Sequence, residues 1–278
     1  MNPVSFLLLL ATLADKNTLD LSWQSLDEEQ TKKVAECLKG NNTITTLYLD
    51  GNNIGDDGAT KIADALRSNT TLTTLHIGGN NIRDDGATKI ADALRSNTAL
   101  TILILCNNNI GDDGASKFAD ALRSNTTLTE LYLCDNIIGD DGASRIADAL
   151  RSNTTLTILG LSNNSIGAGG GTRVAEALKS NTALTTLDLH MNNIGAPLMK
   201  SIKEMILSNI EAQKQIKNET IFLVSWCLKS RRIPVDVINQ MKRFLKTIHY
   251  QHVEEEVDTV PKIAVNKRKL NDGTSKNI

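Results

Sequence analysis

The chain has 278 residues, of which 40% are hydrophobic and only 3% are aromatic, and its formal net charge at pH 7 is -2. This composition is globular and predicts a core of aliphatic side chains, and the near-neutral charge argues against a general nucleic-acid binder. No apolar run reaches the ~18 residues that a membrane-spanning helix needs, so no membrane partner is expected.

The first 16 residues include an apolar stretch from Phe6 to Ala14. This stretch is long enough for the core of a signal peptide, but no lysine or arginine precedes it. We therefore interpret residues 1–16 as a helix that caps the first repeat, with a cleaved signal peptide as the alternative.

Residues 17–210 contain seven copies of one pattern at a period of 28 residues. Each copy carries the letters L-x-L-x-x-N-x-I, in which the first leucine recurs from Leu19 to Leu187. The asparagine recurs from Asn52 to Asn192, and Gln24 replaces it in the first copy. This pattern is that of a leucine-rich repeat.

Each copy is predicted to contain one strand and one helix. Residues 46–50 alternate apolar and polar letters, which indicates a short strand with its leucines facing inward. Residues 56–69 place Ala59, Ile62, Ala63 and Leu66 on one stripe of a helix.

Polar letters of the same copy predict how the helix begins and ends. Asp56 or Asp57 is expected to cap the start of its own helix, where negative charge is favoured. Asn69 is expected to end the helix in the left-handed conformation. The recurring asparagine of the motif is expected to be buried and to satisfy backbone groups of the turn.

A single copy cannot cover its own apolar face, so the copies must stack and share one core. Parallel strands lie ~4.8 Å apart, whereas packed helices need ~8–10 Å. The stack is therefore predicted to curve into an α/β solenoid of horseshoe shape, with strands on the concave face and helices on the convex face.

The repeat length and the helix in every copy resemble the ribonuclease-inhibitor class of leucine-rich repeat proteins. That class also supplies the sensor ends of NOD-like receptors and the body of the Ran GTPase-activating protein. The resemblance implies the fold and does not by itself imply one function.

The chain changes character near residue 200. Residues 1–200 carry 16 basic and 23 acidic side chains (net -7), residues 201–278 carry 14 and 9 (net +5), and the two values sum to -2. Pro197 interrupts the pattern at the start of the seventh helix. Residues 211–250 are predicted to form a helical C-terminal cap, and residues 251–278 a disordered tail.

Positions that alternate with the inward leucines vary from copy to copy, while the helix letters hardly change. This contrast separates a scaffold from a display surface. Tyr48, Ile102, Ile104, Tyr132 and Ile158 are predicted to form an exposed apolar and aromatic patch, which on a protein surface indicates a partner. The full set of predicted partner-binding residues is Trp23, Tyr48, His76, Ile102, Ile104, Cys106, Glu130, Tyr132, Cys134, Ile158, Asp188 and His190.

Cys106 and Cys134 occupy one column on adjacent strands, with Cα atoms expected ~5 Å apart, close enough for a disulfide. The four cysteines otherwise lack the spacing of a disulfide framework or a metal site. Free thiols and a cytoplasmic protein are therefore expected.

The leading hypothesis is a monomeric, non-catalytic module that binds a protein partner on its concave face. His76 and His190 stand 114 residues apart in different columns, and no third ligand or nucleophile accompanies them. We therefore expect no catalytic residues, no metal, no cofactor and no nucleic-acid partner.

Two alternative functions stay open, and a third resemblance extends the leading hypothesis. Arg83 replaces a glycine on a loop rim, and the resemblance to the Ran GTPase-activating protein, whose relevant loops lie on that rim, implies a GTPase-activating protein. Residues 231–245 resemble the start of an F-box, which implies a ubiquitin-ligase adaptor. Residues 253–258 and the basic end resemble type IV secretion signals, which implies that the binding module is an effector of an intracellular bacterium acting in a host cell, or a regulator of such an effector.

Overall fold

The protein is described by a computed structural model over residues 17–229, with side chains up to residue 220. The chain divides into two compact units, Met1–Ala212 and Gln213–Ile278. The predicted N-terminal segment 1–16, the F-box-like residues and the tail lie outside the described residues.

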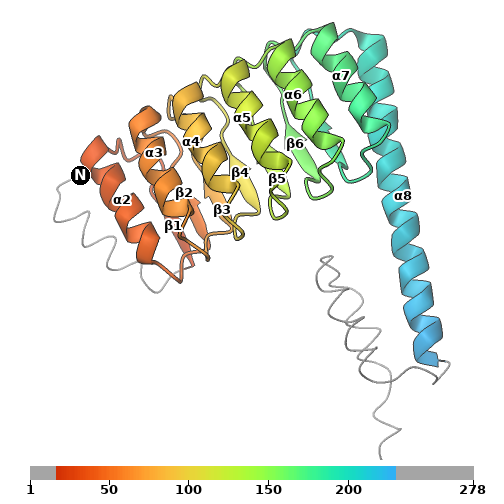
Figure 1. The fold of residues 1–278 in the computed structure, drawn as a ribbon, viewed down its shortest axis with the longest axis horizontal. Helices are drawn as coiled ribbons and strands as arrows, with labels where there is room; N and C mark the ends of the chain where they lie inside the picture. The colour runs from red at the N-terminus through yellow and green to blue at the C-terminus, as the bar shows by residue number, and fades with distance from the viewer. Residues whose placement is uncertain (1–16, 230–278) are drawn as a thin grey trace, which may run out of the picture. The chain divides into compact units, whose positions relative to one another are not determined.

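Seven strands alternate with seven helices over the part of the chain that the structure describes (Figure 1). The strands are β1 (Thr18–Asp20), β2 (Thr46–Tyr48), β3 (Thr74–His76), β4 (Ile102–Ile104), β5 (Glu130–Tyr132), β6 (Ile158–Gly160) and β7 (Thr186–Asp188). The helices are α2 (Glu28–Gly40), α3 (Gly55–Leu66), α4 (Asp84–Leu94), α5 (Asp112–Leu122), α6 (Asp140–Leu150), α7 (Ala168–Leu178) and α8 (Ala196–Lys229).

The strands form one open parallel sheet in chain order, from β1 to β7. Each residue pairs with its counterpart in the next copy, as in Leu19 with Leu47 and Leu47 with Leu75. In the first unit the helices lie in one layer and the strands in the other (Figure 1). The predicted leucine-rich repeat solenoid is therefore confirmed.

The core lies between the two layers and is aliphatic, as the composition predicts. The strand leucines from Leu19 to Leu159 are at most 4% exposed, and the helix alanines Ala59, Ala87 and Ala115 are fully buried. Small side chains in these helix columns let each helix approach the strands and the next helix closely. Phe118 fills the position that Ile62 holds two copies earlier and is also fully buried.

The first turns of α8 close the C-terminal end of the stack. Ile202 is buried, and Leu198, Met199, Met205 and Ile206 pack against the core. These residues precede the predicted cap 211–250. Within that range, residues 211–229 continue α8 as a single helix, and the rest lies outside the described residues.

The predicted capping by Asp56 or Asp57 is wrong, because α3 has no side-chain hydrogen bond at its own start. The first aspartate of a copy instead accepts from the next copy. Asp84 Oδ1 accepts from the N–H groups of Gly111 and Gly114 at 2.7 and 2.9 Å. Asp112 and Asp140 repeat this bond pair in the following copies. Each carboxylate therefore joins two neighbouring helices.

Glycine makes this bond pair possible. A Cβ atom on Gly114 would lie 2.7 Å from Asp84 Oδ1 and 2.8 Å from a methyl group of Ile110. Gly114→Ala is expected to displace the carboxylate and lower the free energy of unfolding by about 2 kcal/mol, measured by urea denaturation. Gly40→Ala is the matched control, because no atom lies within 4 Å of a Cβ there. Equal stability of the two variants would contradict the proposed bond pair.

The predicted left-handed conformation of Asn69 is also wrong, because Asn69 is not among the residues with positive φ. Its buried amide donates to the carbonyl groups of Leu38 and Asn41 in the preceding copy, at 2.7 and 3.1 Å. Its Oδ1 accepts from the N–H groups of Thr71 and Leu72. The asparagine therefore ties the end of one helix to the copy before it.

The predicted structural role of the motif asparagine is confirmed. Asn52 is 1% exposed, and its amide donates to the carbonyl groups of Leu21 and Leu49 at 2.8 and 2.9 Å. Its Oδ1 accepts from the N–H groups of Gln24 and Leu26. These partners are all backbone groups, so this side chain serves the scaffold.

Candidate functional site

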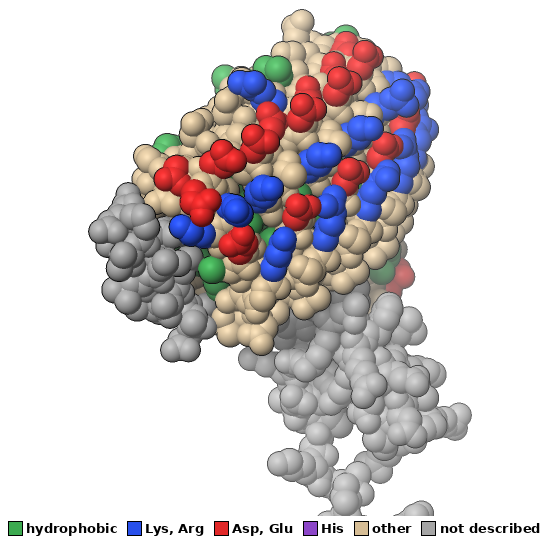
Figure 2. Space-filling view, turned by 60° about the vertical axis from the view of Figure 1, so that its left-hand side comes forward, with side chains coloured by type: hydrophobic (Ala, Val, Ile, Leu, Met, Phe, Trp, Pro, Cys, Tyr) green, Lys and Arg blue, Asp and Glu red, His purple; other side chains and the backbone are tan. Residues whose placement is uncertain are grey.

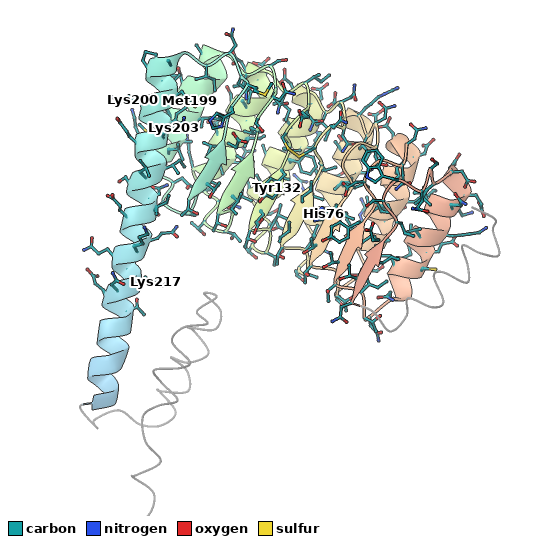
Figure 3. The ribbon with its side chains drawn as sticks, turned by 180° about the vertical axis from the view of Figure 1, so that it is seen from behind. His76, Tyr132, Met199, Lys200, Lys203 and Lys217 are labelled. Carbon is teal, nitrogen blue, oxygen red and sulfur yellow. A yellow bond between two sulfur atoms is a disulfide. The ribbon has the colours of Figure 1, made fainter. Side chains whose placement is uncertain are left out.

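The strand face is the side of the sheet that carries the side chains between the inward leucines. The register brings Tyr48, His76, Ile104 and Tyr132 into one row across β2 to β5. Ile102, Glu130 and Ile158 form a second row on β4 to β6. Figure 3 shows His76 and Tyr132 on the strand side of the unit.

The predicted patch residues are half-buried rather than fully exposed. Side chains on adjacent parallel strands stand ~4.8 Å apart, so each covers the flanks of its neighbours. Trp23 and His190 are exposed, and Asp188 is half-buried on β7. The register therefore groups seven of the twelve predicted residues on β2 to β6, whereas Trp23, Asp188 and His190 lie toward the ends of the sheet.

Polar partners fix two of the strand-face side chains. The Tyr132 hydroxyl donates to Glu130 Oε2 at 2.9 Å, and burial, followed by this bond, raises the pKa of Tyr132. His190 Nδ1 lies 2.6 Å from Asp188 Oδ1. Burial raises the pKa of Asp188, but the hydrogen bonds from His190 and Ser162 outweigh it and lower that pKa overall.

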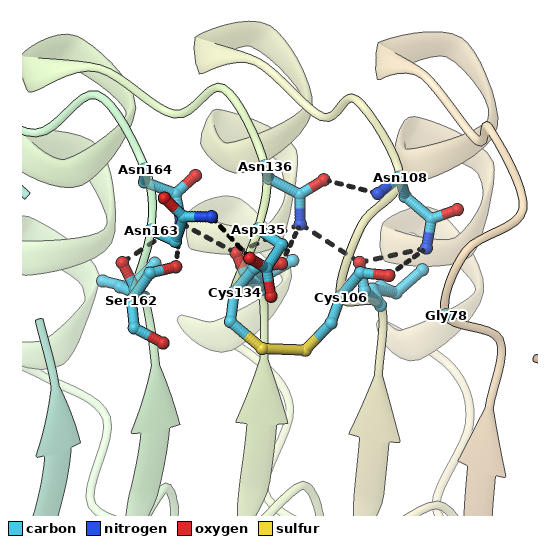
Figure 4. Close-up of a disulfide and its surroundings, with 12 residues drawn as sticks. Gly78, Cys106, Asn108, Cys134, Asp135, Asn136, Ser162, Asn163 and Asn164 are labelled. Carbon is cyan, nitrogen blue, oxygen red and sulfur yellow. Dashed lines mark hydrogen bonds between the residues drawn. A yellow bond between two sulfur atoms is a disulfide. The ribbon is translucent and has the colours of Figure 1, made fainter. Parts of the chain in front are cut away.

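Cys106 and Cys134 form a disulfide across the two loops that follow β4 and β5 (Figure 4). Their Cα atoms are 4.6 Å apart, which agrees with the expected separation. The expectation of free thiols is wrong for this pair, because the shared column on adjacent strands brings the sulfur atoms together. Cys37 is an exposed free thiol.

An open polar depression lies beside the disulfide (Figure 4). Its lining is Asn107, Asp135, Asn136, Asn163, Asn164 and Ser165. Asn163 donates to Asp135 Oδ1 at 2.6 Å, which holds the two exposed side chains together. The sequence contains these polar residues at repeat positions. Their spacing alone did not indicate whether they line a surface depression or only support the fold.

One column of the display surface has a backbone constraint that the sequence analysis missed. Trp23, Gly51, Gly79, Asn107, Asp135, Asn163 and Met191 all have φ between 50° and 68°. Glycine, asparagine and aspartate tolerate this left-handed region. The backbone conformation therefore explains the residue types at the five inner positions of the column. The constraint was detectable, because these residue types recur in the column.

The opposite face is a charged scaffold. Figure 2 shows rows of acidic and basic side chains over the helices. Ion pairs within single helices include Arg67 with Asp64 and Arg123 with Asp120, all on exposed side chains. Such exposed ion pairs contribute little to stability. We therefore interpret the helix face as a solvated surface. Arg83 is exposed at the N-cap position of α4.

No cluster of three or more histidine, cysteine, aspartate or glutamate side chains is arranged to hold a metal ion among the residues that the structure describes. No helix in the described segments has both the length and the apolar character needed to cross a bilayer.

Comparison with known proteins agrees with the fold. Residues 79–212 match the family model described as the TMOD/LMOD leucine-rich domain, and residues 40–63 match a leucine-rich repeat model. The chain is therefore a leucine-rich repeat protein, and these two matches support a protein-binding module. The more specific resemblance to the ribonuclease-inhibitor class stays a prediction.

Two solved structures illustrate the likeness. "Leiomodin-1 Actin-Binding Site 2 (ABS2)" is 22% identical over 67% of this chain and 93% of its own, with a TM-score of 0.47. The tropomodulin C-terminal domain of Caenorhabditis elegans is 9% identical over 77% of this chain and 98% of its own, with a TM-score of 0.42. No curated protein matches the chain.

Proposed function

We propose that this chain is a non-catalytic module that binds a folded protein partner on its strand face. The central patch, defined as Tyr48, Ile102, Ile104, Tyr132 and Ile158, is the proposed contact. The observation that supports it most is the register, which sets four of these side chains on the adjacent strands β4 to β6. Tyr48 lies on β2, and His76 on β3 stands between it and Ile104.

The composition of the patch is not a requirement of the sheet. The column that holds Tyr48, Ile104 and Tyr132 holds Asp20, Gly160 and Asp188 in other copies. The same backbone therefore accepts acidic and small residues, although strands in general favour isoleucine and tyrosine. Large apolar side chains at the middle of a rigid surface are suited to partner binding, because little ordering entropy opposes it.

The test compares two double variants that add the same negative charge. Ile104→Asp with Tyr132→Asp is expected to weaken partner capture by at least ~30-fold, which corresponds to about 2 kcal/mol. Thr70→Asp with Thr98→Asp, at exposed positions in loops that follow the helices, is expected to leave capture unchanged. Partners are identified by affinity purification with the intact chain, and dissociation constants are then measured with the purified partner. Equal capture by both double variants would overturn the proposal.

Actin belongs among the purified proteins to be assayed, because the leiomodin-1 domain is an actin-binding site. The likeness in fold does not assign that ligand to this chain. Delivery to a host cytoplasm as a bacterial effector rests on the tail sequence alone, and the GTPase-activating and ubiquitin-ligase alternatives stay predictions from the sequence.

A further inference from the structure

Trp23 is the most unusual residue on the strand side of the sheet. Its side chain is 77% exposed, and its backbone has a φ of 59°. Large residues rarely adopt this left-handed conformation, and strain of this kind persists most often at functional sites. The inner copies hold glycine, asparagine or aspartate at the same position. The first copy therefore presents an indole where the backbone favours a small or polar residue.

The neighbouring copies leave room for this indole. A Cβ atom on Gly51 would collide with the six-membered ring of Trp23, so only glycine lets the indole rest on that backbone. Gly79 follows in the third copy and also has a positive φ. The backbone N–H of Trp23 donates to the Asp50 carbonyl at 2.8 Å, which fixes the first copy against the second.

Two more rings lie on the adjacent strands. The ring centroids of Tyr48 and His76 are 4.3 Å apart at an interplanar angle of 49°. Aromatic residues make up only 3% of the chain, and Phe118 is buried in the core. Two of the few aromatic side chains, Trp23 and Tyr48, therefore lie with His76 on three successive copies at the N-terminal end of the sheet.

Two carboxylates accompany the rings. Asp50 Oδ1 accepts from the Gly78 N–H at 2.7 Å, and Asp50 Oδ2 lies 3.8 Å from His76 Nδ1. Asp20 is the register partner of Tyr48, and its Oδ1 accepts from the Ser22 N–H at 2.9 Å. Backbone donors thus orient both acidic groups before any partner arrives.

The charge of this region has one sign. The strand-face columns of the first three copies contain Asp20 and Asp50 and no lysine or arginine. Burial lowers the pKa of His76, and the nearby charges of Asp50 and Asp20 oppose that effect only in part. The lowered pKa reduces the positive charge that His76 can set against the two carboxylates.

We infer that the rim cluster, defined as Asp20, Trp23, Tyr48, Asp50 and His76, binds an arginine side chain of the protein partner. A guanidinium is planar, stacks on aromatic faces and pairs with carboxylates, which matches the groups that the cluster offers. A lysine ammonium would use the charge but not the stacking geometry. This inference rests on the proposed function, because the arginine belongs to the partner on the strand face.

The test uses the fluorescence of Trp23 in the full-length chain. The chain contains two tryptophans, so Trp226→Phe leaves Trp23 as the single reporter. The probes are blocked Gly-Arg-Gly, Gly-Lys-Gly and Gly-citrulline-Gly tripeptides, in which citrulline keeps the shape of arginine without its charge. The arginine peptide is expected to quench the emission with a dissociation constant on the order of 1 mM, and the citrulline peptide to bind at least ~10-fold more weakly.

Asp50→Asn in the Trp226→Phe background is expected to weaken the arginine peptide at least ~5-fold. Asp57→Asn is the matched control, because this exposed carboxylate lies in the first turn of α3, and it is expected to change nothing. Equal binding of the arginine and citrulline peptides, absence of quenching, or an unchanged affinity of Asp50→Asn would overturn the inference.

The two proposals fail separately. If the arginine peptide does not bind but Ile104→Asp with Tyr132→Asp still loses the partner, only the role of the rim cluster is wrong. If the arginine peptide binds but that double variant retains the partner, the cluster stands and the central patch is wrong. Stronger binding of the lysine peptide than of the arginine peptide would overturn the assignment of arginine.

Discussion

Asn108→Ala is expected to lower the free energy of unfolding by about 4 kcal/mol. The Asn108 side chain is fully buried and lies in the middle of the stack. Its Oδ1 accepts from the N–H groups of Asn80 and Ile82 at 3.0 and 3.2 Å. Its amide donates to the carbonyl groups of Ile77 and Leu105 at 2.9 and 3.0 Å. Alanine leaves these backbone groups without this partner, at about 1–3 kcal/mol each before water relieves some of the cost.

The place in the stack where Asn108→Ala loses stability is as informative as the size of the loss. Because repeat proteins are stabilised chiefly by contacts between neighbouring copies, loss of Asn108 weakens the junction between the third and fourth copies. Amide hydrogen exchange is expected to become faster at Leu105 and Ile82 and to stay unchanged at Leu161, whose N–H donates to the Asp188 carbonyl at 2.8 Å in a distant part of the stack. Urea denaturation gives the total loss.

Asn109→Gly is the control for Asn108→Ala. Asn109 is exposed and has a φ of 58°, a conformation that glycine adopts without strain. This variant is expected to change the free energy of unfolding by less than ~0.5 kcal/mol. If the two variants lose equal stability, the buried hydrogen bonds are not what holds the third and fourth copies together.

The fold could be predicted because its signal is local and repeated. Within one copy, the spacing of the apolar residues assigns each of them to a strand or a helix, as for Leu47 and Leu49 in a strand and Ala59 in a helix. The parallel register then follows from the period, since each residue pairs with its counterpart 28 positions on, as Leu103 does with Leu131.

Contacts between copies were harder to predict. Asp56 was expected to cap its own helix, but it accepts from the Gly86 N–H of the following copy, and Asn69 bonds to the copy before it. A single copy shows the residue types but not how closely the next helix approaches, which depends on packing through glycine and alanine. The left-handed conformation of Trp23 could not be predicted from its residue type either, because tryptophan does not favour that conformation.

The placement of the candidate site follows from alternation along the strands, and its degree of burial does not. Ile104 and Tyr132 lie on the strand face as predicted, yet both are half-buried by neighbours on adjacent strands. The disulfide illustrates the same limit of the sequence. The shared column placed Cys106 and Cys134 close enough to bond. Free thiols were nevertheless expected, because the cysteine spacing indicated a cytoplasmic protein.

Removal of the disulfide is the second large effect that we expect. The bond between Cys106 and Cys134 spans 28 residues of sequence. Closure of a loop of this length lowers the entropy of the unfolded chain and is worth about 3.5 kcal/mol in the chain-entropy estimate. Cys106→Ser with Cys134→Ser is therefore expected to lower the free energy of unfolding by about 3 kcal/mol in urea denaturation.

Reductant separates the bond from the substitutions themselves. Dithiothreitol is expected to lower the stability of the parent chain to nearly that of the double variant and to leave the double variant unchanged. Cys37→Ser, at an exposed free thiol, is expected to retain the full response to reductant. A parent chain whose unfolding midpoint does not move with dithiothreitol would mean that the two cysteines are thiols. Because the bond joins the loops after β4 and β5, its reduction would loosen the strands that carry Ile104 and Tyr132 before it affects the ends of the stack.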